Sequence, residues 1–529
     1  MTLLQLSDIS DRTEVRASVC VIGAGPAGAL AAYRLARQGV SVLLLESGSL
    51  KAADSDETLN EVESSSGEYQ GARLGRRRGL GGTSAEWGGR LIPLTPHDMS
   101  ERAYIDGPAW PVSWARLQQF SEEICQLLDV AAPKDVAHDK TLKKHAFYDQ
   151  DIVLRQPAIV PMRARNIFSA LHRRVRRKEN LRTVLDATVT GFVLDRERGV
   201  VNGVRARSRT GREMVVKADQ FVLAAGALES TRLLLLLDRL ADGRPFASCQ
   251  ALGRYFQDHL VVDLGQVIGG RPQLVQRLAG RPGMGGLSRA LHLELSPEVQ
   301  QAEKITSAYV SLHLDASGQA AVYDLRNLLR DLQQPGGRMR RSDAFLLSRS
   351  ASLVARMGLW SLYPHRAFLP EGVKLKAQLR IEQRPSAARR ISLSSAHDRL
   401  GVPRIRLAWG ADAHDARALE KARTRFLSAW DRSGLGKSCL IAWESYGTDA
   451  PNALGNLARD VYHPSGTTRM GVNGHNSVVD SDLFCHHVPN LSVLSASVFP
   501  TAGSANPTLT LLQLCAHASD AIGRRATSA

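Results

Sequence analysis

The sequence lacks the long apolar runs that a membrane-spanning helix needs. No stretch approaches the about 18 to 20 consecutive apolar residues that cross a bilayer. The first twenty residues also lack the apolar core of an export signal and carry five charged side chains: Asp8, Asp11, Arg12, Glu14 and Arg16. We therefore expect no transmembrane segment and a cytoplasmic location.

Cysteine is scarce and is not arranged in pairs. The six cysteines are scattered and form no C-x-x-C pair, which excludes a disulfide framework and a structural zinc site of the usual spacing. Cys485 adjoins His486 and His487, but side chains that are adjacent in sequence do not converge easily on one ion. We predict that the chain binds no metal.

Positive charge, by contrast, is abundant. The chain of 529 residues has 68 Lys and Arg against 52 Asp and Glu. The arginine clusters at 76–78, 173–178 and 338–341 are dispersed, lack interleaved aromatic residues and match no nucleic-acid-binding motif. Basicity alone indicates solubility and non-specific attraction, so we do not expect a nucleic-acid partner.

The first fifty residues contain a βαβ unit, in a chain long enough for two connected domains. An apolar run at 17–22 predicts a strand, GAGPAG interrupts it, 29–39 predicts a helix that ends at Gly39, and 40–46 predicts a second buried strand. Strand-like runs follow between 181 and 226, and then a helix at 227–237.

The glycine turn of this unit predicts a dinucleotide site. Gly23 permits a tight turn, Gly25 lets the backbone approach a pyrophosphate, and Gly28 allows the helix to pack closely on the strand. Glu46 ends the second strand, where an acidic side chain accepts a hydrogen bond from a ribose 2′-hydroxyl. The loop alone does not distinguish NAD from FAD.

Two other regions differ from this pattern. Residues 64–89 are rich in Gly and Arg with little periodicity, which predicts a long loop. Residues 343–362 predict an amphipathic helix with exposed Leu and Trp, and we interpret it as core-facing or as a lid rather than as a membrane contact.

Four further segments indicate a family. In order they read LGGTSAEWGG at 80–89, VLAAGALESTRLL at 222–234, VYHPSGTTRMG at 461–471 and LSVLSASVFPTAGSANPTLT at 491–510. Behind the glycine loop, these segments resemble the glucose-methanol-choline (GMC) family of FAD-dependent oxidoreductases. The residue Trp87 and the string GSANPTLT are most similar to the pyranose oxidase and fructose dehydrogenase branches.

The resemblance implies an α/β fold of two domains. It implies a Rossmann-like FAD-binding domain from 1–110, 181–262 and 456–529, and a substrate-binding cap domain of sheet and helices from 111–180 and 263–455. The residues expected to contact FAD are Gly23, Gly25, Pro26, Ala27, Gly28, Glu46, Ser47, Gly81, Gly82, Thr83, Ser84, Trp87, Gly88, Val189, Ala225, Gly226, Ala496, Ser497, Pro507 and Thr508.

The departures from the family pattern are informative. Glu86 stands where a His carries flavin in members that bind it covalently, so we expect dissociable FAD. Thr231 replaces a common Pro or Ser. Ser495 replaces a common Asp, which puts one contact to the flavin diphosphate in doubt.

The resemblance also names a catalytic pair. His463 corresponds to the base, and an imidazole near its reference pKa of about 6.5 can accept a proton near neutrality. Asn506 corresponds to the hydrogen-bonding partner, and the helix after Pro507 would direct its positive end at the flavin. We interpret the remaining candidate histidines as structural: His259, His475, His486, His487 and His517.

The implied reaction is oxidation of a hydroxyl group on a sugar, glycoside or polyol by hydride transfer to flavin N5. Oxidation of a hydrophobic alcohol or sterol, and non-redox lyase chemistry in a protein that retains FAD, remain alternatives. The electron acceptor is also open among O2, a quinone and a redox partner.

Overall fold

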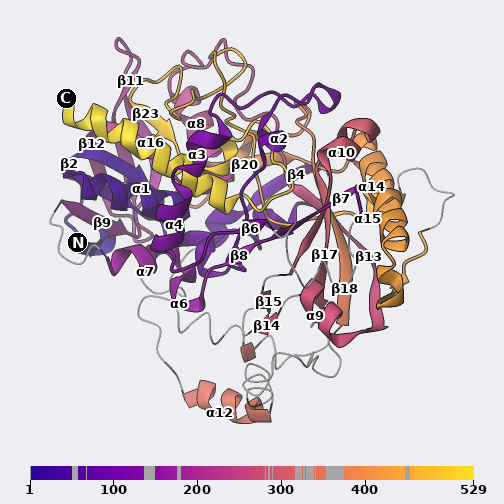
Figure 1. Cartoon of the computed structure of the whole chain (residues 1–529). Helices are drawn as coiled ribbons and strands as arrows, with labels where there is room; N and C mark the ends of the chain where they lie inside the picture. The colour runs from indigo at the N-terminus through magenta and orange to yellow at the C-terminus, as the bar shows by residue number, and fades with distance from the viewer. Residues whose placement is uncertain are drawn as a thin grey trace.

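A computed structural model describes most of the chain. The described residues are 2–49, 57–66, 68–135, 149–174, 180–279, 281–283, 286–288, 290–315, 324–325, 328, 339, 341–352, 355, 374–446 and 453–528. Figure 1 shows two large sheets side by side, with the glycine-loop helix and both termini on the side of the first sheet. In the described part of the chain, no helix is long and apolar enough to cross a membrane.

The first sheet has eight strands taken from distant parts of the sequence. Its order is β1 (Thr2–Gln5), β9 (Leu181–Leu185), β3 (Val42–Leu45), β2 (Thr13–Ile22), β12 (Glu213–Leu223), β11 (Val200–Arg207) and β10 (Thr188–Asp195), and β23 (Leu491–Val493) also pairs with β12. The pairs β10–β11 and β11–β12 are antiparallel, and the others are parallel.

Two long helices pack together on this sheet. The helices α1 (Pro26–Arg37) and α16 (Thr508–Ser528) lie against each other and share one apolar core with the parallel strands. The predicted βαβ unit is confirmed, because β2, α1 and β3 occupy the predicted order. Gly39 follows α1 with φ of +86°, a conformation that ends a helix.

The second sheet is antiparallel throughout. Its order is β21 (Cys439–Trp443), β13 (His259–Gly270), β18 (Lys374–Glu382), β17 (Ala308–Asp315), β16 (His292–Leu295), β7 (Ile152–Gln156) and β6 (Lys134–Asp135), and β22 (Arg459–Asp460) pairs with β13.

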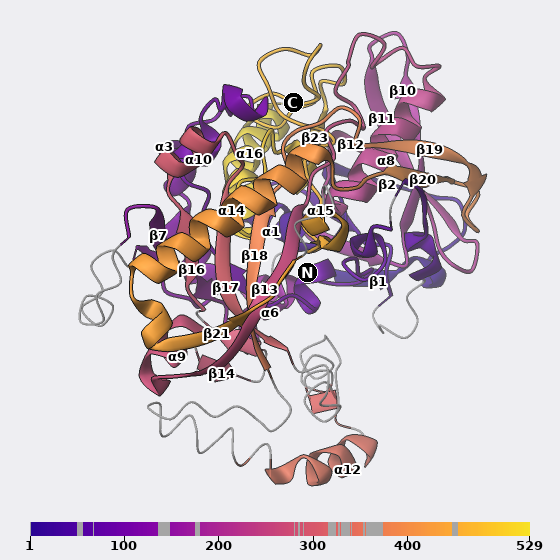
Figure 2. The ribbon, with the colours of Figure 1, turned by 90° about the vertical axis from the view of Figure 1, so that its right-hand side faces the viewer.

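The two faces of the second sheet differ in polarity, because side chains alternate along a strand. One face is apolar and packs on the long helix α14 (Ala413–Arg432), which crosses in front of the sheet in Figure 2. Leu379 and Ile381 of β18 share this core with Phe426 of α14. The alternate residues Arg380 and Glu382 lie on the other face, which we call the polar face.

Several short helices pack in the core of the first sheet. The helices α3 (Trp114–Gln118), α4 (Ser121–Leu127), α6 (Met162–Arg165) and α7 (Ile167–His172) contribute buried side chains to the core of the first sheet. We predicted that 111–180 belongs to the cap domain, and for these helices this is wrong because their apolar side chains pack with α1 and α16. The β6 and β7 parts of the segment do join the second sheet, and the other domain limits stay predictions.

The remaining elements are small. A three-stranded sheet joins β19 (Arg390–His397), β20 (Pro403–Ala408) and β4 (Val62–Ser66), and two short pairs join β5 (Arg90–Leu91) with β8 (Ala158–Ile159) and β14 (Arg281–Gly283) with β15 (Gly286–Ser288). The short helices are α2 (Pro96–Met99), α9 (Pro272–Ala279), α10 (Pro297–Glu303), α12 (Arg341–Arg349) and α15 (Ala453–Leu457).

The segment 343–362 is only partly described. Its first residues form α12, which lies apart from both sheets in Figures 1 and 2, and Phe345 on it is 65% exposed. The described part of the segment does not face the core, so our interpretation of the segment as core-facing is wrong for this part. Residues 353–354 and 356–362 lie outside the described residues, and the lid interpretation stays a prediction.

Candidate active site

The glycine loop between β2 and α1 has the geometry of a dinucleotide site. Gly23 has φ of +103°, and a Cβ there would lie 2.6 Å from the carbonyl oxygen of Ala224. A Cβ on Gly28 would lie 1.9 Å from the carbonyl oxygen of Gly23, so α1 packs directly on the turn. A Cβ on Gly25 would meet no atom within 4 Å, which leaves room for a phosphate at the N-terminus of α1. The first helical turn contains the next two predicted residues, Pro26 and Ala27.

Glu46 holds the glycine loop to two other loops at the end of β3. Its carboxylate accepts hydrogen bonds from the backbone N–H groups of Ala24 (2.8 Å), Gly48 (2.8 Å) and Gly79 (2.9 Å). Burial raises the pKa of the Glu46 carboxyl. The next residue, Ser47, accepts a hydrogen bond at Oγ from Arg78 (2.9 Å).

The segment 80–89 lies directly on the glycine loop. The N–H of Gly81 donates to the carbonyl oxygen of Ala24 (2.9 Å), and a Cβ on Gly82 would lie 3.0 Å from Cα of Gly25. Gly81 and Gly82 both have positive φ, which favours glycine at this approach. The structure therefore brings together two segments that are more than fifty residues apart in sequence.

The other predicted residues of this segment are held by backbone groups. Ser84 Oγ accepts from the N–H of Ile167 (3.1 Å), and Trp87 Nε1 donates to the carbonyl oxygen of Arg165 (2.8 Å). The carbonyl oxygen of Thr83 accepts from the N–H of Trp87 (3.1 Å). Gly88 has no atom within 4 Å of an added Cβ.

The arginine cluster at 76–78 binds carboxylates of the same chain. Arg76 and Arg78 contact Glu229 of α8 (Gly226–Leu240) at 2.9 and 3.3 Å, and Arg77 forms an ion pair with Glu86. Burial opposes ionisation of Glu229, but the charges of the surrounding arginines outweigh it and lower its pKa to about 2. The sequence did not predict the pairs with Glu229, because α8 lies about 150 residues further along the chain.

The segments 461–471 and 491–510 bond to each other and to α8. The N–H of Thr468 donates to the carbonyl oxygen of Ser497 (2.8 Å), and that of Gly466 donates to Ala496 (3.3 Å). Thr231, one of the departures from the family pattern, pairs its hydroxyl with that of Thr467 (2.7 Å). The structure also locates three other residues predicted to contact FAD. Gly226 begins α8 with φ of +79°, Ala225 precedes it as N-cap, and Val189 is buried in β10.

The two predicted catalytic residues meet. His463 Nε2 lies 3.3 Å from Asn506 Nδ2, although 43 residues separate them in sequence. Asn506 immediately precedes Pro507, and α16 begins at Thr508. The amide oxygen Oδ1 of Asn506 is buried without a hydrogen-bond partner. An unpaired buried acceptor beside an imidazole is the kind of group that a bound ligand satisfies.

A third residue contacts this pair. Nδ1 of His259 lies 3.0 Å from Nδ1 of His463, and the two rings meet edge to face with centroids 5.1 Å apart. Nε2 of His259 lies 2.6 Å from the carbonyl oxygen of Gly503. We predicted a structural role for His259, and the structure instead places it against the predicted base. No spacing within the sequence indicated this contact, because 204 residues separate the two histidines.

These contacts determine the tautomer of His463. A carbonyl oxygen only accepts, so His259 carries its proton on Nε2 and, when neutral, presents a bare Nδ1. The Nδ1 of His463 must then donate the hydrogen bond to His259, which leaves Nε2 of His463 unprotonated toward Asn506. An unprotonated nitrogen is what a general base requires.

Burial keeps both rings neutral. Burial lowers the pKa of His463 well below the usual value, and the charges of His259, Arg380 and Arg90 lower it further. Burial likewise lowers the pKa of His259. Our expectation that His463 titrates near 6.5 is wrong, because a charged imidazole is unfavourable in a dry site beside arginines.

A carboxylate supports the two histidines from behind. Asp258 accepts hydrogen bonds from the backbone N–H groups of His259 (2.6 Å) and His463 (3.0 Å) and from the hydroxyl of Tyr69 (2.7 Å). Burial raises the pKa of Asp258 to about 7. Its bonds fix the backbone of both histidines at once.

The remaining histidines bind groups away from this pair. Nitrogen atoms of His475, His486 and His487 contact the carbonyl oxygens of Ser248, Gly471 and Gly474 at 2.8, 3.1 and 2.9 Å. His517 Nε2 contacts Asp482 at 2.9 Å. These contacts fit the predicted structural roles.

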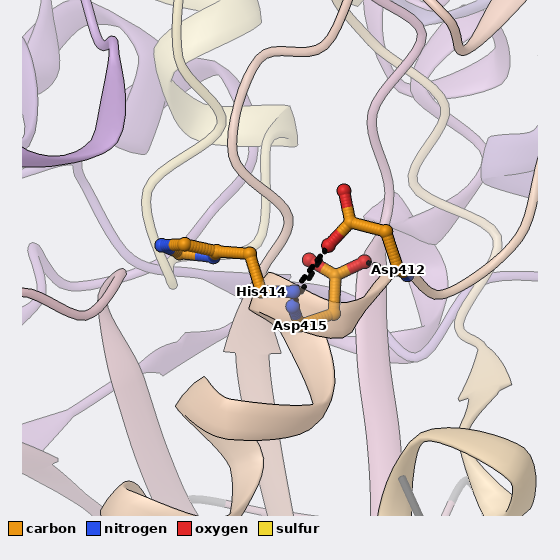
Figure 3. Close-up of side chains that lie close together, drawn as sticks. All are labelled: Asp412, His414 and Asp415. Atoms are coloured by element: carbon orange, nitrogen blue, oxygen red, sulfur yellow. Dashed lines mark hydrogen bonds between the residues drawn. The ribbon is translucent and has the colours of Figure 1, made fainter.

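One group of side chains has metal-like spacing. Ligand atoms of Asp412, His414 and Asp415 lie within 4.8 Å of one another (Figure 3). Asp412, however, accepts from the N–H groups of His414 and Asp415 as the N-cap of α14, and Arg389 bonds to both carboxylates. We therefore interpret the group as a helix cap with an ion pair.

The residues at the glycine loop and the His463 pair fit FAD. The free space at Gly25 and the acceptor Glu46 suit the diphosphate and ribose, while the unpaired Oδ1 of Asn506 suits the reacting end. Comparison with known proteins agrees with this. A family model described as GMC oxidoreductase matches residues 385–514, and one described as FAD dependent oxidoreductase matches residues 18–251.

The chain belongs to the GMC oxidoreductase family. It is 25% identical to paromamine 6'-oxidase from Streptomyces fradiae over 93% of this chain and 88% of that protein. It is 31% identical to C-glycoside 3-oxidase from Arthrobacter globiformis over 26% of this chain and 24% of that protein. The crystal structure of pyridoxine 4-oxidase from Mesorbium loti matches the fold with a TM-score of 0.59, at 16% identity, over 96% and 99% of the two chains.

These findings confirm the predicted family, the α/β fold and the FAD cofactor. This GMC oxidoreductase is an FAD-dependent enzyme that acts on CH–OH groups.

Proposed function

We propose that this GMC oxidoreductase oxidises a hydroxyl group of a sugar, glycoside or polyol to a carbonyl, with His463 as the base. When bound, FAD supplies the hydride acceptor, flavin N5. The observation that carries the proposal is the contact of His463 Nε2 with Asn506 Nδ2 at 3.3 Å. The hydrogen bonds of His259 assign this nitrogen the unprotonated form. The names of two relatives, paromamine 6'-oxidase and C-glycoside 3-oxidase, support a sugar-like substrate.

Each polar group of the site has its own role in the proposed reaction. His463 Nε2 takes the hydroxyl proton, and the Nδ2 N–H of Asn506 donates to the substrate oxygen as it gains charge. His259 accepts from His463 Nδ1 and holds the ring in its base form. The N-terminus of α16 adds positive potential behind Asn506.

We also propose that FAD is held without a covalent bond. Glu86 offers no nucleophilic nitrogen, and its carboxylate is engaged by Arg77. Denatured holoenzyme should release its flavin to the supernatant of an acid precipitation. Flavin that stays with the precipitated chain would contradict this.

The remaining parts of the proposal concern the cellular setting. The electron acceptor would be O2, a quinone or a redox partner protein. We propose a cytoplasmic location, which the six unpaired cysteines support.

An anaerobic substrate screen tests the proposed function. Holoenzyme is mixed without oxygen with sugars, glycosides, polyols, long-chain alcohols and a sterol, and bleaching of the flavin absorbance is followed. We expect sugars, glycosides or polyols to bleach the flavin, and admission of air then shows whether O2 reoxidises it within a turnover. Bleaching only by the long-chain alcohols or the sterol would assign the enzyme to the hydrophobic class, and cleavage of a cyanohydrin without bleaching would indicate a lyase.

A further inference from the structure

Three carboxylates on the polar face of the second sheet form ion pairs with nearby cations. Glu382 pairs with Arg102 (2.7 Å), Glu294 with Arg155 (2.9 Å) and Asp263 with Lys376 (3.0 Å). Glu382 and Glu294 also accept from the N–H of Gly503 and the hydroxyl of Ser504 (both 2.8 Å). These bonds hold Gly503 and Ser504, which shortly precede Asn506, against the polar face.

Arg380 differs from the other cations of this face. Its guanidinium donates to Ser311 Oγ (3.0 Å) and Gln378 Oε1 (2.6 Å), and it lies 5.8 Å from the centroid of the Tyr309 ring. All three partners are neutral, and within the described residues no carboxylate pairs with it. An Arg offers five N–H donors, so this site keeps a positive charge and further donors for a ligand.

Arg380 lies close to the reacting groups. In the register of the sheet it is opposite Val261 and Tyr309, and two residues further along the same strand Glu382 is opposite His259. Two residues of strand span about 7 Å, so Arg380 lies one row from the histidine that contacts His463. The lowered pKa of His463 agrees with this position, because after burial and His259 its next cause is the charge of Arg380.

A second group on the same face is unsatisfied. His292 is 1% exposed, its Nε2 has no hydrogen-bond partner, and its ring stacks on Tyr309 at 3.9 Å. Strand register places His292 on the same face as Glu294 and Tyr309. Arg90 lies near enough that, after burial, the charge of Arg380 lowers the pKa of Arg90. The guanidinium groups of Arg380 and Arg90 favour an anionic ligand here, and such a ligand would satisfy Nε2 of His292 in the tautomer that carries its proton on that nitrogen.

We propose that Arg380, with His292 beside it, binds a carboxylate of the substrate, so that the enzyme prefers hydroxyl compounds bearing an acidic group over those bearing an ammonium group. The inference rests on the proposed function and narrows its substrate class to acidic sugars and related hydroxy acids. Arg380 presents a planar pair of N–H groups that suits a carboxylate, and it repels an ammonium at the same place.

The test uses three glycosides that differ only at C6. Methyl glucoside carries a hydroxymethyl group there, methyl glucuronide a carboxylate, and the 6-amino-6-deoxy glucoside an ammonium. Binding to oxidised holoenzyme is measured by perturbation of the flavin absorbance, and anaerobic flavin reduction is measured separately. Binding tests the preference for an acid, whereas reduction tests the proposed function.

Arg380→Met removes the charge, and Arg380→Lys keeps it without the planar fork. Lys374→Met is the matched control, because it removes one positive charge from the exposed end of the same strand and face. A hydrogen-bonded charge pair corresponds to about 10- to 100-fold in affinity. We expect Arg380→Met to weaken binding of the glucuronide by that factor and leave the glucoside unchanged, with Arg380→Lys between the two and Lys374→Met like the wild type.

The proposal is overturned if the glucuronide binds no better than the glucoside, if none of the three binds, or if the amino glycoside binds best. It is also overturned if Arg380→Met weakens all three ligands equally, since the residue would then act on the fold or the flavin. Tight binding of the glucuronide without flavin reduction would uphold the acid preference while contradicting the proposed oxidation of this class.

Discussion

At the scale of single residues, the chemistry depends on which nitrogen of His463 carries a proton. A backbone carbonyl at Gly503 sets the proton of His259, and His259 in turn sets that of His463. Burial lowers the pKa of both rings, which favours the neutral form that a general base needs. This arrangement resembles the general rule that a base is oriented by a third group.

Substitution of His259 tests whether its hydrogen bond orients His463. His259→Leu removes the acceptor for His463 Nδ1, and we expect flavin reduction to slow by about tenfold or more because the base loses its orientation. His259→Asn can still accept from His463 through its side-chain oxygen, so it should retain more of the rate than the Leu variant. Equal rates in the two variants would show that His259 only fills space.

The pH dependence of flavin reduction tests the lowered pKa of His463. A base whose pKa lies below the usual value of about 6.5 stays unprotonated as pH falls through 6.5, so the rate should decline only in more acidic solution. Asp258 titrates near 7 beside it, and Asp258→Asn removes that carboxyl. An inflection at or above 6.5 that persists in Asp258→Asn would contradict the lowered pKa.

At the scale of secondary-structure elements, local patterns were predictable and long-range pairings were not. The β2–α1–β3 unit follows from apolar runs and glycines within thirty residues, and its prediction was confirmed. The pairing of His259 with His463 joins residues 204 apart, and the Glu229 ion pairs join segments about 150 apart. Such contacts depend on strand order and register, which one sequence does not reveal.

The start of α14 gives a prediction at this scale. Asp412 caps this helix and pairs with Arg389, so Asp412→Ala should lower the free energy of unfolding by about 1 kcal/mol. Asp412→Asn keeps a good cap and should lose less. Urea unfolding measures both variants. A rise in stability on addition of Zn²⁺ or Ca²⁺, absent in Asp412→Ala, would instead indicate a metal site.

At the scale of the whole molecule, the active site forms where the two sheets meet. The first sheet presents the glycine loop, and the polar face of the second sheet presents His259 and Arg380. One link between them is the fully buried pair of Arg102, from the loop after α2, and Glu382 of β18. Glu382 also accepts from Gly503, whose carbonyl oxygen holds His259.

Breaking this pair should be costly. Arg102→Met leaves Glu382 as an uncompensated buried charge, and we expect a loss of about 3 to 5 kcal/mol in the free energy of unfolding. The exposed pair Arg196–Asp242 is the control, and Arg196→Met should cost at most about 1 kcal/mol. Similar losses in the two variants by urea unfolding would contradict the linking role.

The most direct test of the account is the rate of anaerobic flavin reduction in His463→Ala holoenzyme, with a substrate found in the screen. Removal of a general base slows a reaction by about 10² to 10⁴, so we predict a loss of that order with FAD absorbance retained. His475→Ala removes an exposed histidine bound to a backbone carbonyl and should reduce at the wild-type rate. Flavin reduction at the wild-type rate in His463→Ala would contradict the assignment of His463 as the base.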